Sequence, residues 1–167
     1  MKIVIAGPGA LGSLLAAVLG RWGGHELWVL DHHPERAALL AARGFWLEEN
    51  GRQVHPRCRV TAEPTEAGSA DVVFLCVKSR AVAGALPRLA PVLSATSLLI
   101  AFQNGISHFD FIQDQLPAGC WAAGVTAQGA TLLGPGRIRH GGQGPTRLGF
   151  MAAPVPSAVR LVHRAAD

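Results

Sequence analysis

Three glycines near the N-terminus have the spacing needed to hold the pyrophosphate of a dinucleotide. Gly7, Gly9 and Gly12 form a G-x-G-x-x-G motif between an apolar segment, 2–6, and a Leu- and Ala-rich segment, 13–21. We expect Gly7 to permit a tight strand-to-helix turn, Gly9 to let the backbone approach the phosphates, and Gly12 to let the helix pack closely on the strand. The phosphates would bind at the helix N-terminus, where free N–H groups and the positive dipole end stabilise negative charge. The predicted binding residues are Gly7, Pro8, Gly9, Ala10, Leu11 and Gly12.

An acidic residue follows the second predicted strand. Gly23 and Gly24 lead into an apolar strand over 25–30, and Asp31 comes directly after it, nineteen residues beyond Gly12. This is close to the spacing of about 20 residues expected for the acid that binds the adenosine ribose. In the alternative interpretation the glycines form an ordinary turn and Asp31 only caps the next helix.

Two polar residues follow later strands. The apolar run 70–77 ends at Lys78, and the run 97–102 ends at Gln103-Asn104-Gly105. In an open α/β sheet the ligand lies beyond the carboxyl ends of the strands, so Lys78 and Asn104 are predicted to face the cofactor. The alternatives are a solvated strand-end cation for Lys78 and an ordinary Asn-Gly turn for Asn104.

The elements that must position these residues alternate between strand and helix patterns. This alternation predicts a Rossmann-type, doubly wound, mostly parallel α/β sheet with helices on both faces. Besides the strands above, we expect helices over 34–43, 79–93, 107–116 and 154–167, a hairpin over 45–54, and an extended segment over 57–61.

Composition narrows the functional classes. The 167 residues are 49% hydrophobic and 16% charged, which predicts a single domain over 1–167. The net charge is +4, but the basic residues are scattered, so no nucleic-acid partner is expected. Cys58, Cys76 and Cys120 lack metal-ligand spacing, which predicts reduced thiols and no metal site. Glycine and proline interrupt the apolar N-terminal run, so we expect neither a signal peptide nor a membrane span. The protein is therefore expected to be cytoplasmic.

Taken together, these motifs resemble the ketopantoate reductases, also called 2-dehydropantoate 2-reductases. The resemblance covers nearly the whole chain and is more specific than the glycine motif alone. It rests on the opening strand with residues 7–12, Val77-Lys78-Ser79, Gln103-Asn104-Gly105, Gly124-Val125-Thr126, and the segment 134–142 with its glycines and basic residues.

The resemblance implies NADPH-dependent reduction of 2-dehydropantoate, a 2-keto acid, to pantoate in pantothenate and coenzyme A biosynthesis. Lys78 and Asn104 match the family's strand-end pair that contacts the cofactor and borders the substrate pocket. The family commonly has an arginine near the end of the second strand for the 2′-phosphate of NADP, whereas this chain has Asp31, which favours NAD. His32, His33 and Arg36 could still surround a 2′-phosphate, so NADP and NAD both remain open.

The family's catalytic lysine and a substrate-binding glutamate lie in a helical C-terminal domain, and this sequence ends at Asp167. Three explanations stay open: a domain of a longer enzyme, a natural fragment that pairs with a helical partner or another copy, and a stand-alone dinucleotide-binding or redox-sensing module without catalysis. Another Rossmann dehydrogenase acting on a 2-hydroxy acid or sugar phosphate is the further enzyme alternative.

Overall fold

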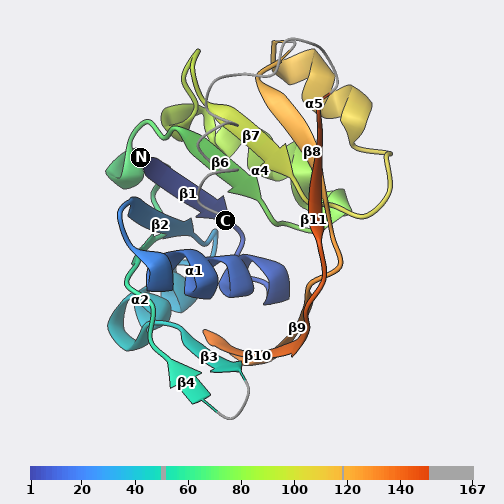
Figure 1. The fold of residues 1–167 in the computed structure, drawn as a ribbon. Coiled ribbons are helices and arrows are strands. Elements are labelled where there is room, and N and C mark those ends of the chain that lie inside the picture. Colours follow the sequence, from blue (N-terminus) through green and yellow to red (C-terminus); the bar gives the residue numbers. More distant parts are fainter. Residues whose placement is uncertain (50–51, 118, 151–167) are drawn as a thin grey trace.

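A seven-stranded sheet forms the centre of the protein in this computed structural model, which describes residues 1–49, 52–117 and 119–150 (Figure 1). Its strand order is β11-β8-β7-β6-β1-β2-β5, and every neighbouring pair is parallel except the antiparallel pair of β11 and β8. The strands are β1 (Lys2–Ala6), β2 (Glu26–Leu30), β5 (Arg59–Thr61), β6 (Val72–Leu75), β7 (Leu98–Ala101), β8 (Trp121–Thr126) and β11 (Thr146–Phe150). The predicted mostly parallel α/β fold is confirmed.

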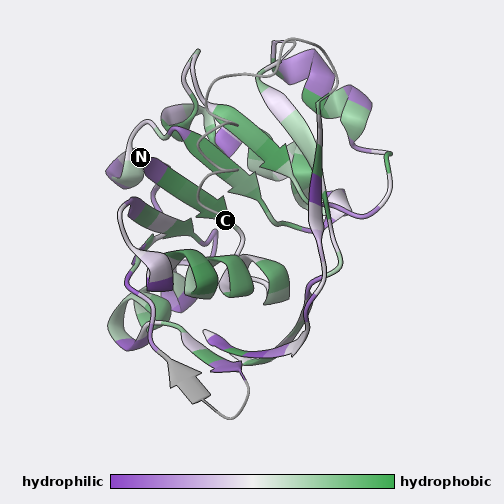
Figure 2. Ribbon diagram, viewed as in Figure 1, coloured by the Kyte–Doolittle hydropathy of each residue, from purple (hydrophilic) through white to green (hydrophobic). Residues whose placement is uncertain are grey.

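The central strands are continuous apolar runs because both of their faces are covered. All four residues of β6 and all four of β7 are buried, as are four of the five in β1. Such uninterrupted runs are typical of parallel strands with helices on both sides. Figure 2 shows these strands and α1 mostly in the hydrophobic colour.

The helices cover both faces of the sheet. They are α1 (Ala10–Trp22), α2 (Pro34–Arg43), α3 (Pro64–Ala67), α4 (Val82–Arg88) and α5 (Phe109–Gln115), with 3₁₀ turns η1 (Ser79–Ala81) and η2 (Ala90–Val92). One apolar core includes Leu14 of α1, and the opposite core includes Leu86 of α4 and Ile112 of α5.

A second, smaller sheet has the order β4-β3-β10-β9. Its strands are β3 (Trp46–Glu49), β4 (Arg52–Val54), β9 (Gly129–Gly134) and β10 (Arg137–Gly142), and α1 lies between it and the central sheet (Figure 1). The two hairpins join through a parallel pairing of β3 with β10, in which Leu47 is opposite Ile138. Both of these side chains are fully buried in the core that contains α1, so the small sheet closes that core.

A polar network ties the small sheet to α1. The Nδ1 atom of His140 lies 2.6 Å from Oε1 of Glu49, and Arg21 of α1 donates a hydrogen bond to Oε2 of the same carboxylate at 2.9 Å. These hydrogen bonds, first from His140 and then from Arg21, lower the pKa of Glu49 below its ordinary value. The carboxylate of Glu49 therefore ties the carboxyl end of β3 to His140 of β10 and to Arg21 of α1.

Most predicted elements agree with the structure, and one is wrong. The helix over 34–43 has the predicted bounds, whereas α1 begins at Ala10, inside the glycine motif. The single helix predicted over 79–93 is instead η1, α4 and η2. Pro87 lies inside α4, one residue before its end, and Pro91 inside η2, and neither has a backbone N–H to continue the helical ladder, which accounts for the early end of α4. The helix predicted over 154–167 lies outside the described residues.

No helix within the described ranges is both long and apolar enough to span a bilayer. The same part of the chain contains no group of three or more His, Cys, Asp or Glu residues that could hold a metal ion.

Candidate cofactor site

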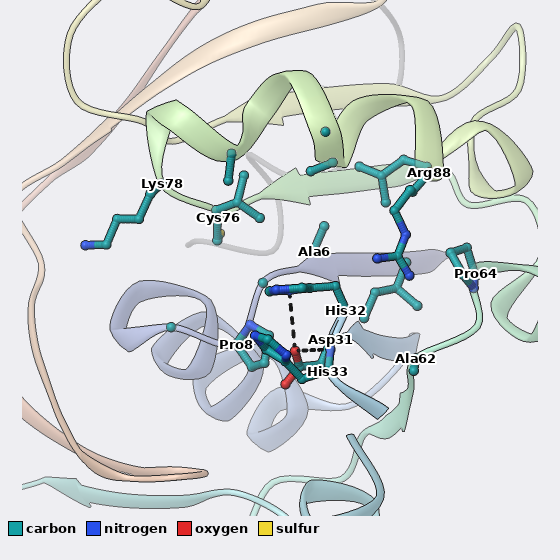
Figure 3. A pocket seen from close by; sticks show the side chains of 18 of the residues that line it. Ala6, Pro8, Asp31, His32, His33, Ala62, Pro64, Cys76, Lys78 and Arg88 are labelled. Atoms are coloured by element: carbon teal, nitrogen blue, oxygen red, sulfur yellow. Dashed lines mark hydrogen bonds and ion pairs between the residues drawn. The ribbon is translucent and has the colours of Figure 1, made fainter. Parts of the chain in front are cut away.

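A cavity of about 650 Å³ opens at the carboxyl edge of the central sheet, where β1, β2 and β6 end. The loop after β1 and the residues after β2 line one wall, and η1 and α4 line the other (Figure 3). The predicted ligand position, beyond the carboxyl ends of parallel strands, is therefore a cavity.

The glycine loop has the geometry that its sequence predicts. Gly7 has a φ of +97°, a conformation that side chains other than glycine rarely adopt. A Cβ atom at Gly12 would lie 2.1 Å from the carbonyl oxygen of Gly7, so helix and turn approach too closely for any side chain. A Cβ at Gly9, by contrast, would meet no atom within 4 Å. Gly9 thus leaves open the cavity-facing space in which a pyrophosphate would approach the backbone, and the residues fit a dinucleotide.

Hydrogen bonds from Ser13 of α1 also fix the glycine loop. The buried hydroxyl of Ser13 donates a hydrogen bond to the carbonyl oxygen of Pro8 at 3.1 Å, and the backbone N–H of Ser13 donates to the oxygen of Gly9 at 2.9 Å. The N–H groups at the start of α1 are thereby held next to the cavity before any ligand binds.

Asp31 lies at the end of β2 as predicted, but its side chain is fully buried. Arg36 donates hydrogen bonds to both carboxylate oxygens, from Nε to Oδ2 and from Nη2 to Oδ1 at 2.7 Å, and the backbone N–H of His33 donates to Oδ1 at 3.1 Å. The hydrogen bond with Asp31 raises the pKa of Arg36. Every oxygen of this acid is engaged by the protein itself, which is not the environment of a free ribose acceptor.

Four cations line the cavity, and Asp31 is the one carboxylate among the described lining residues. The cations are Arg36, Lys78, Arg80 and Arg88, and of these Arg36 alone forms an ion pair within the described part of the chain. His32 is also on the wall and 59% exposed, and its partial burial, together with the neighbouring His33 ring, lowers its pKa. The cavity therefore has an excess of positive charge, which favours an anionic ligand.

The sulfur that faces this cavity is not reactive. Cys76 lies at the end of β6, and burial raises the pKa of its thiol to about 12. A thiol with that pKa stays protonated near neutral pH, so Cys76 acts as wall and not as a nucleophile.

Gln103 fixes the strand end that carries Lys78. Its buried side-chain Nε2 atom donates hydrogen bonds to the carbonyl oxygens of Leu75 at 2.7 Å and of Val77 at 3.0 Å. The backbone just before Lys78 is thus attached to the end of β7. Asn104, the next residue, is exposed at the same edge of the sheet.

The structure brings most of the predicted residues to one cavity. Those that line it are Gly7, Pro8, Gly9, Asp31, His32, His33, Arg36 and Lys78. Ala10, Leu11, Gly12 and Asn104 do not line it. The first three belong to α1, and Leu11 lines a separate hollow together with Leu15 and Phe102.

Sequence reasoning missed Arg80, Arg88 and Gln103. Arg88 had a recognisable signal, because Ala81, Gly84 and Arg88 recur at helical spacing on the face opposite the apolar residues of α4.

Comparison with known proteins assigns the fold and motifs to a family. Residues 3–153 match the model of the family described as "Ketopantoate reductase PanE/ApbA". The chain belongs to the ketopantoate reductase family. This result confirms the resemblance noted in the sequence.

Individual ketopantoate reductases and related structures give the same result. A 2-dehydropantoate 2-reductase of Halobacterium salinarum is 31% identical over 150 residues, which are 89% of this chain and 49% of that protein. The crystal structure of a PanE/ApbA family ketopantoate reductase from Ralstonia eutropha matches with a TM-score of 0.85 and 28% identity, covering 99% of this chain and 53% of the other. A D-mandelate dehydrogenase solved with NADH and anilino(oxo)acetate matches with a TM-score of 0.89 and 25% identity, covering 99% and 54%. The chain thus spans about half the length of the curated relatives it matches.

Proposed function

We propose that this chain is the cofactor-binding part of an NADP-dependent oxidoreductase that reduces 2-dehydropantoate to pantoate. The observation that carries the proposal is the cationic cavity beside a glycine loop whose middle glycine, Gly9, leaves its approach open. Membership of the ketopantoate reductase family supports the reaction. The pathway would be pantothenate and coenzyme A biosynthesis, in the cytoplasm.

When bound, a reduced nicotinamide supplies the hydride. The residues of this chain would bind and orient the reactants. The loop around Gly9 and the N-terminus of α1 would hold the pyrophosphate, and the ammonium group of Lys78 would bind a phosphate or the carboxylate of the keto acid. The amide of Asn104 would form paired hydrogen bonds with the nicotinamide ribose and the substrate hydroxyl. Orientation of the two reactants is the main contribution this half of a cleft can make.

The reaction also requires a proton donor. A ketone that accepts a hydride also needs a proton, and a positioned proton donor accelerates such a step by about 10²- to 10⁴-fold. We assign that donor and the other wall of the substrate cleft to a helical domain or partner, consistent with relatives that are about twice as long.

Titration of the purified protein with NADPH, followed by energy transfer from its four tryptophans, tests cofactor binding. Gly9→Val places a branched side chain where the pyrophosphate would lie, so the affinity should fall at least tenfold while the unfolding midpoint stays near that of the wild type. Gly149→Val is the matched control, since a Cβ there would also meet nothing within 4 Å and Gly149 does not line the cavity. Equal NADPH affinity in Gly9→Val and wild type would refute the assignment of the loop.

A second candidate substrate is the keto form of mandelate. The structural match to a D-mandelate dehydrogenase solved with NADH and anilino(oxo)acetate favours it, since that match covers 99% of this chain at 25% identity. The test adds each keto acid separately to the protein loaded with NADPH or NADH, together with the second domain, and measures oxidation of the cofactor. Oxidation with the keto form of mandelate and none with 2-dehydropantoate would replace 2-dehydropantoate as the proposed substrate.

A further inference from the structure

We propose that His108 makes the Asn104 side of the cofactor site sensitive to acid: its neutral ring, buried at the start of α5, holds this helix and the loop 104–107 in place, and protonation of the ring releases both. The inference rests on the proposed dinucleotide site, whose regulation it describes. It assigns a role to a residue that does not line the cofactor cavity.

His108 is a buried polar side chain without a hydrogen-bond partner. Only 4% of the residue is exposed, and neither ring nitrogen has a partner within the described part of the chain. The ring packs edge-to-face with Phe109, at 4.9 Å between centroids, and Phe109 packs in the same way with Trp121 of β8 at 5.3 Å. This cluster accommodates a neutral imidazole as an aromatic ring, whereas a buried imidazolium without partners is costly.

The elements around the ring supply no charge that would stabilise its protonated form. Strands β7 and β8, on which α5 packs, contain no charged or titratable side chain (Figure 1). The acids of α5 are Asp110 and Asp114, and neither accepts a hydrogen bond from the ring. The cations just before η1, in η1 and in α4 line the cofactor cavity: Lys78, Arg80 and Arg88. Burial therefore lowers the pKa of the imidazole without an opposing charge.

Backbone hydrogen bonds tie the start of α5 to the preceding loop. The N–H of Phe109 donates to the carbonyl oxygen of Ile106 at 3.0 Å, and the N–H of Ile112 donates to that of His108 at 3.1 Å. The buried ring thus belongs to the same turn that holds the end of the loop.

The other side of the loop contacts η1. The hydroxyl oxygen of Ser107 lies 3.4 Å from that of Ser79, the residue directly after Lys78. The loop is therefore held between the first turn of α5 and the strand end that carries Lys78. Release of the ring frees the segment that contains Asn104, the residue assigned above to the nicotinamide ribose.

The direction of the pH effect follows from the burial of the ring. In the released form the imidazole is in water and has its ordinary pKa of 6.5, whereas in the buried form its pKa is lower. The released form therefore binds more protons, and it is favoured as the pH falls below 6.5. Each pH unit in this range shifts the equilibrium by up to about tenfold, until the buried ring also titrates. Above 6.5 the ring is neutral in both forms and the loop stays closed.

Hydrogen exchange, measured residue by residue on the whole protein, reports the release directly. The readouts are the protection factors of the Phe109 and Ile112 amides at pH 7.5 and pH 5.5, which are corrected for intrinsic exchange. In the wild type they should fall about three- to tenfold at the lower pH. In His108→Phe, whose ring does not titrate, they should change less than twofold. His55→Phe removes an exposed histidine instead and should retain the pH dependence of the wild type.

Two additions complete the experiment. His108→Gln, which is neutral at both pH values, gives the same comparison if the phenylalanine variant does not fold. The acid-stable oxidised cofactor NADP⁺, at ten times its dissociation constant, connects the turn to the site. Because binding stabilises only the closed loop, it should raise the protection of the same amides at pH 5.5 by about three- to tenfold.

The outcomes separate this inference from the proposed function. Equal protection at both pH values in the wild type, or the same pH dependence in the His108 variants, would overturn the acid release and leave the dinucleotide site standing. Bound NADP⁺ without any change in α5 protection would show that this turn does not regulate the site. Failure of the folded wild-type protein to bind NADPH or NADP⁺ would overturn the proposed function and, with it, the regulation of that site.

Discussion

Replacing Gly12 by alanine should destabilise the protein, whereas the same change at Gly9 should leave stability almost unchanged. The added Cβ at Gly12 would lie 2.1 Å from the oxygen of Gly7, about 1.3 Å closer than ordinary van der Waals contact. The atom in the way belongs to the backbone, and the turn that carries it is held by the φ of +97° at Gly7. Relief thus requires α1 and the turn to move apart.

The magnitude follows from two opposing effects. Overpacking of a closely packed contact costs about 1–3 kcal/mol, and a backbone neighbour favours the upper end of that range. Alanine in place of glycine within a helix returns up to about 1 kcal/mol. The net loss for Gly12→Ala is about 2 kcal/mol, equivalent to a decrease in Tm of about 4–8 °C for a domain of this size.

The assay is urea and thermal unfolding of wild type, Gly12→Ala and Gly9→Ala, followed by tryptophan fluorescence. Gly9 precedes α1 as its N-cap residue, where alanine is a poorer cap than glycine, so this control should lose only about 0.5 kcal/mol. If Gly12→Ala proves as stable as Gly9→Ala, the close approach of turn and helix is not a packing constraint and the reasoning is refuted.

Three further expectations concern polar residues. Asp31→Asn should lower the free energy of unfolding by about 1.5–3 kcal/mol through the weakened bonds with Arg36, and should change the NADH dissociation constant by less than threefold; a tenfold loss of NADH affinity would instead make Asp31 a ribose ligand. Gln103→Leu removes the side-chain donor from the carbonyl oxygens of Val77 and Leu75, of which Leu75 keeps the backbone N–H of Phe102, and should cost about 1–2 kcal/mol in urea unfolding, together with a weaker NADPH affinity; unchanged values for both would show that it does not hold the strand ends. The pKa of Glu49 is lower in the folded than in the unfolded state, so the ionised carboxylate stabilises the folded state by about 0.5–1 kcal/mol above pH 4.5, and this contribution is lost as the pH falls below that value. Glu49→Gln should therefore reduce the loss of stability between pH 6 and pH 3. Identical curves of unfolding free energy against pH for the variant and the wild type, measured by urea unfolding, would contradict this.

The sequence predicted the parts of the fold whose signals are local. The central strands could be read as continuous apolar runs, and the helix over 34–43 was bounded by Pro34 and Gly44. The prediction for 79–93 is wrong because the spacing of its apolar residues is helical throughout, whereas Pro87 and Pro91 end α4 early through missing backbone hydrogen bonds. Hydrophobic periodicity describes which residues are buried and says little about where a short helix ends.

The candidate site was predictable to a similar degree. The glycine loop and Lys78 could be placed because a strand end determines their position. The ion pair of Asp31 with Arg36 could not be predicted, since an acid at that position also fits a ribose ligand, and only the orientation of the arginine distinguishes the two roles. Nor could the sequence reveal that Gln103 rather than Asn104 bridges the strand ends, because both are polar residues that follow a buried run.

The parallel pairing of β3 with β10 has a consequence for synthesis of the chain. Glu48 and its partner Arg139 are 91 residues apart in the sequence, so the first hairpin leaves the ribosome long before the strand that completes its sheet. At about 5–20 residues per second this interval lasts roughly 5–20 s. During it, Phe45 and Leu47 can pack against α1, but the surface later covered by Ile138 remains open to other proteins in the cell. The nascent chain therefore passes through a period in which that surface is exposed to the chaperones of the cell.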